Sequence, residues 1–235
     1  MKNKLVVLNH KMNLLYDDIY KYIQDINQIE TDNDIIVLPS SLYLEAFVNN
    51  CSWGVGCQNF YYELEGDYTG EISTNQLRSL GVEYAMIGHY ERKKYFKESM
   101  EDVRKKLETC LEANIMPILC LGDNGSCDWE KVIKEQLDCY LKNIAHIEFI
   151  TFAFEPEEAL ESDHEYDLER LEEVVNYIAD YLENKYKVVP KILYGGNVNE
   201  KNVKNILHIS KLSGIIIGTS SISASIVKNI VSSIE

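Results

Sequence analysis

Short apolar runs alternate with longer amphipathic stretches along the whole chain, and this alternation restricts the fold more than any other sequence feature. The runs are rich in Val, Ile, Leu and aromatic residues, and most are apolar throughout: 4–8, 34–38, 53–58, 84–87, 116–121, 149–154, 191–193 and 214–217. A parallel strand that is buried on both faces has this composition. We therefore predict eight parallel strands.

The stretches between these runs have helical periodicity. In one of them Val103, Leu107 and Leu111 share a face behind Ser99, a residue type suited to an N-cap. Similar patterns cover 74–80, 129–143, 168–182, 202–208 and 222–234. Eight strand–helix units without a linker favour the α/β class and a closed (β/α)8 TIM barrel, with residues 1–235 in one domain. A doubly wound open sheet alternates in the same way, so periodicity alone does not separate the two folds.

Composition limits the partners. A formal net charge of −15 argues against a general affinity for nucleic acid or for anionic membrane surfaces, so an anionic substrate needs a local positive site. The six cysteines form no CxxC pair and have no zinc-like spacing. No apolar run is long enough for a signal peptide or a membrane span. We expect a soluble, cytoplasmic protein with reduced thiols.

Polar residues follow three of the predicted strands, at the end where a barrel keeps its active site. Lys11 follows the first run and could offer a fixed positive charge to an anion, whereas we expect its neighbour His10 to be structural. His89 follows the fourth run at the start of a helical turn, whose dipole would lower its pKa and keep the ring neutral. Glu155 follows the sixth run, where partial desolvation would make the carboxylate more basic. In isolation each residue also fits a structural or surface role.

The loops after the last two runs are rich in glycine. Paired glycines allow backbone N–H groups to approach a phosphate closely, and the loops after strands seven and eight are the usual phosphate site of such barrels. The predicted phosphate-binding residues here are Gly195, Gly196, Asn197, Gly218 and Thr219.

Seven motifs then occur in the order in which triosephosphate isomerases have them, from the first strand to the last. They are Asn9-x-Lys11-Met12-Asn13, Gly56-Cys57-Gln58-Asn59, Tyr68-Thr69-Gly70-Glu71-Ile72-Ser73, Ile87-Gly88-His89-x-Glu91-Arg92, Leu119-Cys120-x-Gly122, Phe154-Glu155-Pro156 and Tyr194-Gly195-Gly196. The chain therefore resembles that family over nearly its whole length, which favours the closed barrel over the open sheet.

The resemblance implies an activity and a set of roles. It implies interconversion of dihydroxyacetone phosphate and glyceraldehyde 3-phosphate through an enediolate, a step of glycolysis and gluconeogenesis, with no metal or organic cofactor. Glu155 resembles the general base and His89 the neutral electrophile. Lys11 resembles the stabilising cation, Asn9 the amide that orients the substrate oxygens, and Glu91 the carboxylate that pairs with the lysine.

Further positions follow from the same resemblance. Leu160 and Ile216 match the aliphatic residues that clamp the base, and squeezing water from Glu155 would raise its pKa. Thr69 matches a loop that inserts into a partner subunit, which implies a homodimer. Glu161 stands where the family has a glycine whose backbone N–H binds the phosphate.

The lid departs from the family. Residues 157–164 read Glu-Glu-Ala-Leu-Glu-Ser-Asp-His where the family typically has Val-Trp-Ala-Ile-Gly-Thr-Gly-Lys. The carboxylate of Glu161 must therefore point away from a phosphate dianion. Glu158 replaces the lid tryptophan, and Asp123 stands at the position of its carboxylate partner, so these two acids cannot latch each other at neutral pH without a shared proton or cation. Tyr90 replaces a serine, Asn197 the serine of the YGGS motif, and Thr219 the second glycine of the last loop.

These departures leave two alternatives. The protein could isomerise another small ketose phosphate, for example a tetrulose phosphate, or it could be a catalytically weakened paralogue that only binds. The complete set of Asn9, Lys11, His89 and Glu155 argues against the second alternative.

Overall fold

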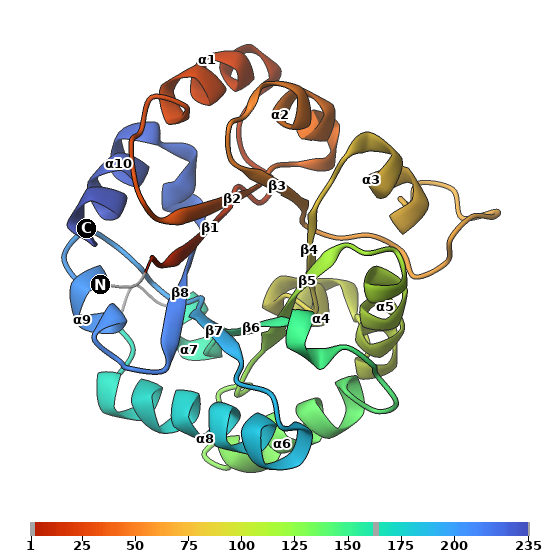
Figure 1. The fold of residues 1–235 in the computed structure, drawn as a ribbon, viewed down its shortest axis with the longest axis vertical. Coiled ribbons are helices and arrows are strands. Elements are labelled where there is room, and N and C mark those ends of the chain that lie inside the picture. Colours follow the sequence, from red (N-terminus) through yellow and green to blue (C-terminus); the bar gives the residue numbers. More distant parts are fainter. Residues whose placement is uncertain (1–2, 162–164, 235) are drawn as a thin grey trace.

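Eight parallel strands close into one barrel in the computed structural model, which describes residues 3–161 and 165–234 (Figure 1). Each strand pairs with its neighbour in the chain, and β1 pairs with β8 to close the ring. The strands are Leu5–Asn9 (β1), Asp34–Leu38 (β2), Gly54–Cys57 (β3), Tyr84–Ile87 (β4), Met116–Leu121 (β5), Thr151–Phe154 (β6), Lys191–Tyr194 (β7) and Leu212–Ile217 (β8). The predicted closed barrel is confirmed.

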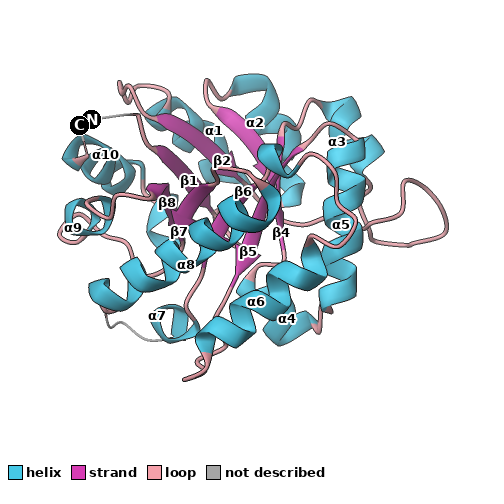
Figure 2. Cartoon of the chain, turned by 60° about the horizontal axis from the view of Figure 1, so that its bottom comes forward, coloured by secondary structure: helices cyan, strands magenta, loops and turns pink. Residues whose placement is uncertain are grey.

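Helices surround the barrel and cover the outer faces of the strands (Figures 1 and 2). The α-helices are Tyr16–Ile26 (α1), Leu44–Asn50 (α2), Thr74–Leu80 (α3), Tyr90–Phe96 (α4), Met100–Glu112 (α5), Trp129–Tyr140 (α6), Glu157–Glu161 (α7), Leu168–Tyr186 (α8), Val203–Leu207 (α9) and Ala224–Ser233 (α10). Short 3-10 turns are Ser41–Tyr43 (η1), Ile147–Phe149 (η2) and Thr219–Ile222 (η3). Of the helices described, none is both long and apolar enough to cross a lipid bilayer.

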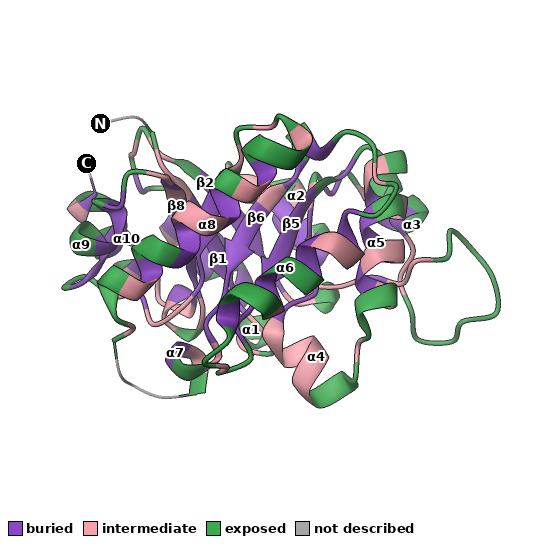
Figure 3. Ribbon diagram, turned by 90° about the horizontal axis from the view of Figure 1, so that it is seen from below, coloured by how far each residue is buried: buried purple, intermediate pink, exposed green. Residues whose placement is uncertain are grey.

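Two apolar clusters explain why the strands read as continuous hydrophobic runs. Alternate strand residues point inward and outward. One set, which includes Val7, Ile118 and Leu193, fills the inside of the barrel. The other set, which includes Val6 and Leu119, packs against the helices. Figure 3 shows buried residues on the strands and on the inner faces of the helices. Both faces of each strand are therefore removed from water.

Element boundaries differ from the sequence prediction where short 3-10 turns intervene. The predicted strand 149–154 begins at Thr151, because 147–149 form η2 and Phe149 is 59% exposed. The predicted helix 222–234 begins at Ala224, because 219–222 form η3. The predicted cap at Ser99 is confirmed: its Oγ accepts from the backbone N–H of Asp102, and the Asp102 carboxylate accepts from the backbone N–H of Ser99.

Candidate active site

Residues that are far apart in the chain meet at the carboxyl end of the barrel in one line of polar contacts. The Nζ of Lys11 lies 2.8 Å from Oε1 of Glu91. The backbone N–H of Glu91 donates to Nδ1 of His89 at 3.2 Å, and Nε2 of His89 lies 3.4 Å from Oε1 of Glu155. The side chain of Asn9 is 3.5 Å from the same Nε2. All five residues that the resemblance assigned to catalysis are therefore neighbours in space.

The position of His89 fixes its tautomer. It is the N-cap of α4, and its Nδ1 accepts the hydrogen bond from the Glu91 backbone. A nitrogen that accepts a hydrogen bond carries no proton, so the neutral ring carries its proton on Nε2. That proton faces the interior of the site and the Glu155 carboxylate. With Nδ1 occupied as an acceptor, Nε2 is the ring nitrogen that can direct a proton into the site.

Glu155 is held in a dry environment at the end of β6. Its side chain is only 2% exposed, and burial raises its pKa, while His89 and Lys93 oppose the shift. The backbone N–H of Tyr90 donates to its Oε2 at 3.1 Å. A carboxylate with a raised pKa that is still ionised is a stronger base than one in water.

Gly195 and Ile216 shape the space around this carboxylate. A Cβ at Gly195 would lie 3.0 Å from Cγ of Glu155 and 3.6 Å from Cβ of Ile216. Any side chain at 195 would therefore displace the carboxylate. Ile216, which is 4% exposed, belongs to the apolar cluster inside the barrel.

Lys11 is fixed by its own backbone and by the loop after β8. Its φ is +52°, and its backbone N–H donates to Oδ1 of Asn9 at 3.1 Å. The side-chain amide of Gln58 donates to its carbonyl at 2.9 Å. A Cβ at Gly218 would lie 3.4 Å from Cε of Lys11, so a larger residue there would crowd the lysine stem. Both Gly218 and Lys11 thus belong to the same corner of the site.

Two hollows adjoin at these residues. One, of about 390 Å³, is lined by Lys11, Glu91 and the lid residues Leu160 and Glu161, together with Tyr90, Lys94 and Tyr95. The other, of about 380 Å³, includes Asn9, Lys11, His89 and Glu91 in its lining. Lys11 and His89 therefore face space that a small anion can occupy, and the Glu155 carboxylate lies 3.4 Å from Nε2 of His89.

The lid begins with α7, directly after Glu155-Pro156. Asp123 binds the backbone of the lid: its Oδ1 accepts a hydrogen bond from the N–H of Glu157 at 3.1 Å. Its Oδ2 accepts from the hydroxyl of Tyr166 at 3.2 Å. The sequence left Asp123 without a latch partner, because Glu158 stands at the position of the lid tryptophan, and it did not indicate Tyr166 as a donor. Residues 162–164 of the lid, Ser162, Asp163 and His164, lie outside the described residues.

The remaining predicted residues occupy the loops that the sequence indicated. Gly196 and Asn197 follow β7, and Thr219 begins η3 after β8. The carbonyl of Asn197 accepts from the side chain of Asn202 at 2.8 Å, which ties the loop to the residue before α9. Thr69 is exposed in the loop that projects between β3 and α3, and the next residues, Gly70, Glu71 and Ile72, line the hollow beside Lys11 (Figures 1 and 2).

His10 turns away from the site, although it is next to Lys11. Its Nε2 lies 3.1 Å from the Tyr22 hydroxyl, and its ring packs edge-on against Tyr22 and Phe47. Burial lowers its pKa to about 4. These contacts agree with the structural role that we expected for it.

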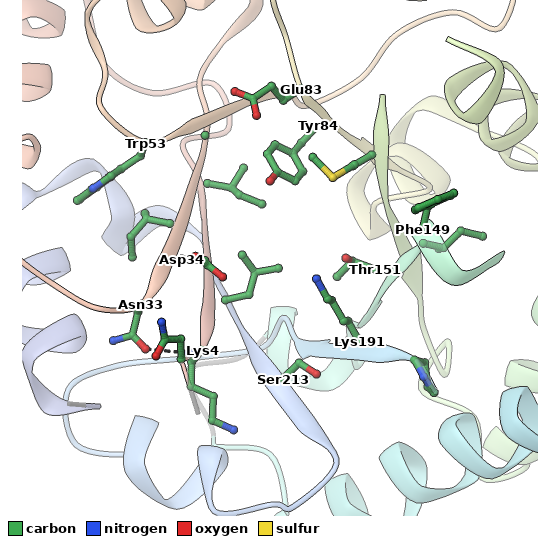
Figure 4. A pocket seen from close by; sticks show the side chains of 18 of the residues that line it. Lys4, Asn33, Asp34, Trp53, Glu83, Tyr84, Phe149, Thr151, Lys191 and Ser213 are labelled. Atoms are coloured by element: carbon green, nitrogen blue, oxygen red, sulfur yellow. Dashed lines mark hydrogen bonds between the residues drawn. The ribbon is translucent and has the colours of Figure 1, made fainter. Parts of the chain in front are cut away.

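The opposite end of the barrel carries a wide hollow of about 1030 Å³ (Figure 4). Its lining contains residues that begin strands, among them Asp34, Tyr84, Thr151 and Lys191. Basic and acidic side chains are mixed there, and the Nζ of Lys4 donates a hydrogen bond to the carbonyl of Leu212 at 2.7 Å. In such barrels this end contributes to stability and the carboxyl end holds the chemistry. We place the functional site at the carboxyl end.

The closed barrel, with a buried glutamate, a histidine and a lysine grouped at its carboxyl end, is that of a (β/α)8-barrel enzyme. Within the described ranges, no group of three or more His, Cys, Asp or Glu side chains is arranged to hold a metal ion. The sequence profile of the triosephosphate isomerase family matches residues 4–234.

Individual relatives give the same result. The chain is 34% identical to triosephosphate isomerase of Francisella tularensis subsp. mediasiatica (strain FSC147), covering 94% of this chain and 93% of the relative. It is 31% identical to the triosephosphate isomerase of Ehrlichia chaffeensis (94% and 92% covered) and 28% to that of Buchnera aphidicola subsp. Baizongia pistaciae (98% of each). The chain belongs to the triosephosphate isomerase family, so the predicted family and the isomerase class are confirmed.

Proposed function

We propose that this protein interconverts dihydroxyacetone phosphate and glyceraldehyde 3-phosphate through an enediolate. The observation that carries the proposal is the grouping of Lys11, His89 and Glu155: Lys11 and His89 line one hollow, and Nε2 of His89 lies 3.4 Å from Oε1 of Glu155. Membership of the triosephosphate isomerase family supports the choice of a phosphorylated triose as substrate. The alternatives of a larger ketose phosphate or of a binding paralogue are not favoured.

Each group has a role in the proposed proton transfer. Glu155 takes a proton from the carbon next to the carbonyl and returns it to the neighbouring carbon. The Nε2–H of His89 donates to the substrate oxygen that becomes negative, and Asn9 orients the substrate oxygens. Lys11, paired with Glu91, stabilises the enediolate charge. Acid, base and cation are thus all supplied by side chains.

The phosphate is proposed to bind at the loops after β7 and β8. Gly196, Asn197, Gly218 and Thr219 would present backbone N–H groups. The N–H of Gly195 already donates to the carbonyl of Phe154 at 2.8 Å, so Gly195 would contribute space rather than a donor, and Glu161 would approach the phosphate from the lid. The closeness of Gly218 to Lys11 supports this placement, because it sets the cation next to the loop. Leu160 and Ile216 are proposed to cover Glu155 and to exclude water from it.

The substrate is tested by comparing triose with tetrose phosphates. We expect kcat/KM for glyceraldehyde 3-phosphate to exceed that for erythrose 4-phosphate by at least about tenfold, because one extra carbon in a closed site costs roughly 10- to 200-fold. A coupled assay with purified protein measures both rates. A preference for the tetrose would favour the larger ketose phosphate, and no turnover of either would favour the binding paralogue.

We also propose that the active form is a homodimer. The loop between β3 and α3 projects from the barrel (Figures 2 and 3). At its base the ring of Tyr61 stacks on the ring of Tyr62, with 4.3 Å between the ring centroids, and lies 4.7 Å, centroid to centroid, from the ring of Tyr68. Thr69 is exposed in this loop. The hollow beside Lys11 is lined by Met12 and Phe96, which are 96% and 63% exposed. An exposed apolar surface of this kind is typical of an interface, and the loop of a second copy would cover it.

A charged side chain in the loop should separate the subunits. We expect Thr69→Arg to shift the species in solution from two copies of the 27.1 kDa chain to one, and to lower activity with it, because the arginine would meet the Lys11 corner of the partner. Light scattering after size-exclusion chromatography measures the mass. Asn184→Arg, exposed on α8, adds the same charge elsewhere and should leave the mass unchanged. A wild-type protein that is monomeric would contradict the proposal.

Further properties belong to the same proposal. Residues 1–235 are proposed to form a single domain, because strands from the two ends of the chain, β1 and β8, pair with each other. A cytoplasmic location is proposed because all six cysteines are free thiols, as is usual in a reducing compartment. The proposed role is in glycolysis and gluconeogenesis.

A further inference from the structure

Four side chains join the lid helix α7 to α4, and we call this group the lid clasp: Tyr90 and Lys94 on α4, Glu157 and Glu161 on α7. The hydroxyl of Tyr90 donates to the carboxylates of Glu161 and, at 3.3 Å, of Glu157. The Nζ of Lys94 pairs with the Glu161 carboxylate and donates to the Tyr90 hydroxyl at 2.6 Å. In Figure 3 both helices lie at the same end of the barrel.

The spacing of these residues suits a contact between two helices. Tyr90 and Lys94 are four residues apart on α4, and Glu157 and Glu161 are four apart on α7, so each pair lies on one helix face. The Tyr90 hydroxyl accepts from Lys94 and can turn its own proton toward Glu161. The single hydroxyl proton can serve Glu161 or Glu157, while the Lys94 ammonium stays paired with Glu161.

The lid clasp borders the proposed phosphate site. Tyr90, Lys94 and Glu161 line the same hollow as Lys11. An unpaired carboxylate at about 5 Å from a phosphate would weaken its binding by roughly a hundredfold per unit charge at an effective dielectric near 20, before screening by salt. Paired with Lys94, the Glu161 carboxylate is neutralised and held toward α4.

We propose that Tyr90 and Lys94 are positioning residues that hold the Glu161 carboxylate away from the substrate phosphate and so let an acidic lid cover an anion. This inference rests on the proposed function, because it needs a phosphorylated substrate. It explains two departures from the family pattern together, because the tyrosine at 90 hydrogen-bonds the glutamate at 161. Lys94 acts through Glu161 and does not bind the phosphate itself.

A double-mutant cycle tests the proposal by steady-state kinetics with glyceraldehyde 3-phosphate. We expect Lys94→Met to raise KM about fivefold and to change kcat less than about twofold, since the freed carboxylate repels the substrate. In the Glu161→Gln background the same substitution should change KM less than about twofold. Lys94→Arg should restore the wild-type KM. Lys228→Met removes an exposed charge from α10, outside the clasp, and serves as the control.

Two kinetic outcomes would overturn the proposal. A KM that rises equally in both backgrounds would mean that Lys94 contacts the phosphate directly. A Lys94→Met variant with an unchanged KM would mean that the Glu161 charge does not bear on binding.

Hydrogen exchange separates failure of this inference from failure of the proposed function. In the substrate-free protein, Lys94→Met should accelerate exchange of the α7 amides and Lys228→Met should not, because only the first loosens the lid. If the wild-type protein does not turn over triose phosphates, the proposed function fails, and accelerated exchange still supports the tether. Unchanged exchange overturns the tether whatever the kinetics show.

Discussion

Glu155→Gln is expected to lower kcat by about 10³- to 10⁴-fold, because the amide cannot accept the substrate proton. The substitution preserves size and leaves an oxygen for the backbone N–H of Tyr90, so the fold should persist. Kinetics on protein with an unchanged circular dichroism spectrum measure the effect. Glu112→Gln, exposed at the end of α5, is the matched control and should retain full activity.

The pH profile gives a second check on the same carboxylate. Burial raises the pKa of Glu155, and the base must be ionised to act. We therefore expect kcat/KM to rise with pH through a pKa above the ordinary range of a glutamate, and this acid limb to be absent from the residual activity of the glutamine variant. A variant that keeps more than a tenth of the wild-type kcat would show that another group is the base.

Lys11→Met should lower kcat/KM by about 10²- to 10³-fold, the usual effect of removing one preorganised electrostatic contact to a developing negative charge. The loss has two parts. The cation beside the enediolate disappears, and the Glu91 carboxylate, which paired with it at 2.8 Å, is left facing the hollow. Both effects oppose an anionic substrate, so KM should rise as kcat falls.

Lys21→Met is the control for this second substitution. It removes the same charge from the exposed face of α1, where the side chain is 78% exposed. An equal loss in both variants would mean that the overall field of this acidic protein, rather than the position of Lys11, limits the reaction. If the Lys11→Met variant retained wild-type activity, Lys11 would have no part in the mechanism.

Much of the barrel could be predicted from local patterns. The bounds of β2, β4 and β5 agree with the apolar runs, because every residue after the first in each of these strands is buried on whichever face it points to. The cap at Ser99 also follows from local chemistry. The start of β6 could not be predicted in this way, since Phe149 is as apolar as a strand residue but lies in an exposed 3-10 turn.

The candidate site was predictable in part. The resemblance indicated Lys11, His89 and Glu155 by their motifs, and these side chains do lie together. The lid was different. The sequence left Asp123 without a latch partner, whereas the structure gives Asp123 the Tyr166 hydroxyl, which lies 43 residues away along the chain. No periodicity or family motif identifies that donor.

The sequence by itself determined the alternation of buried strands and amphipathic helices, because burial and helix capping are decided within a few residues of the chain. Only the tertiary structure decided which partner each charged side chain has. The pairs Lys11–Glu91 and Lys94–Glu161 span 80 and 67 residues, and they meet because barrel closure brings the ends of separate strands and their loops to one rim. From the sequence alone, the Glu161 carboxylate is expected to repel an anionic substrate. In the structure, the same carboxylate forms an ion pair with Lys94.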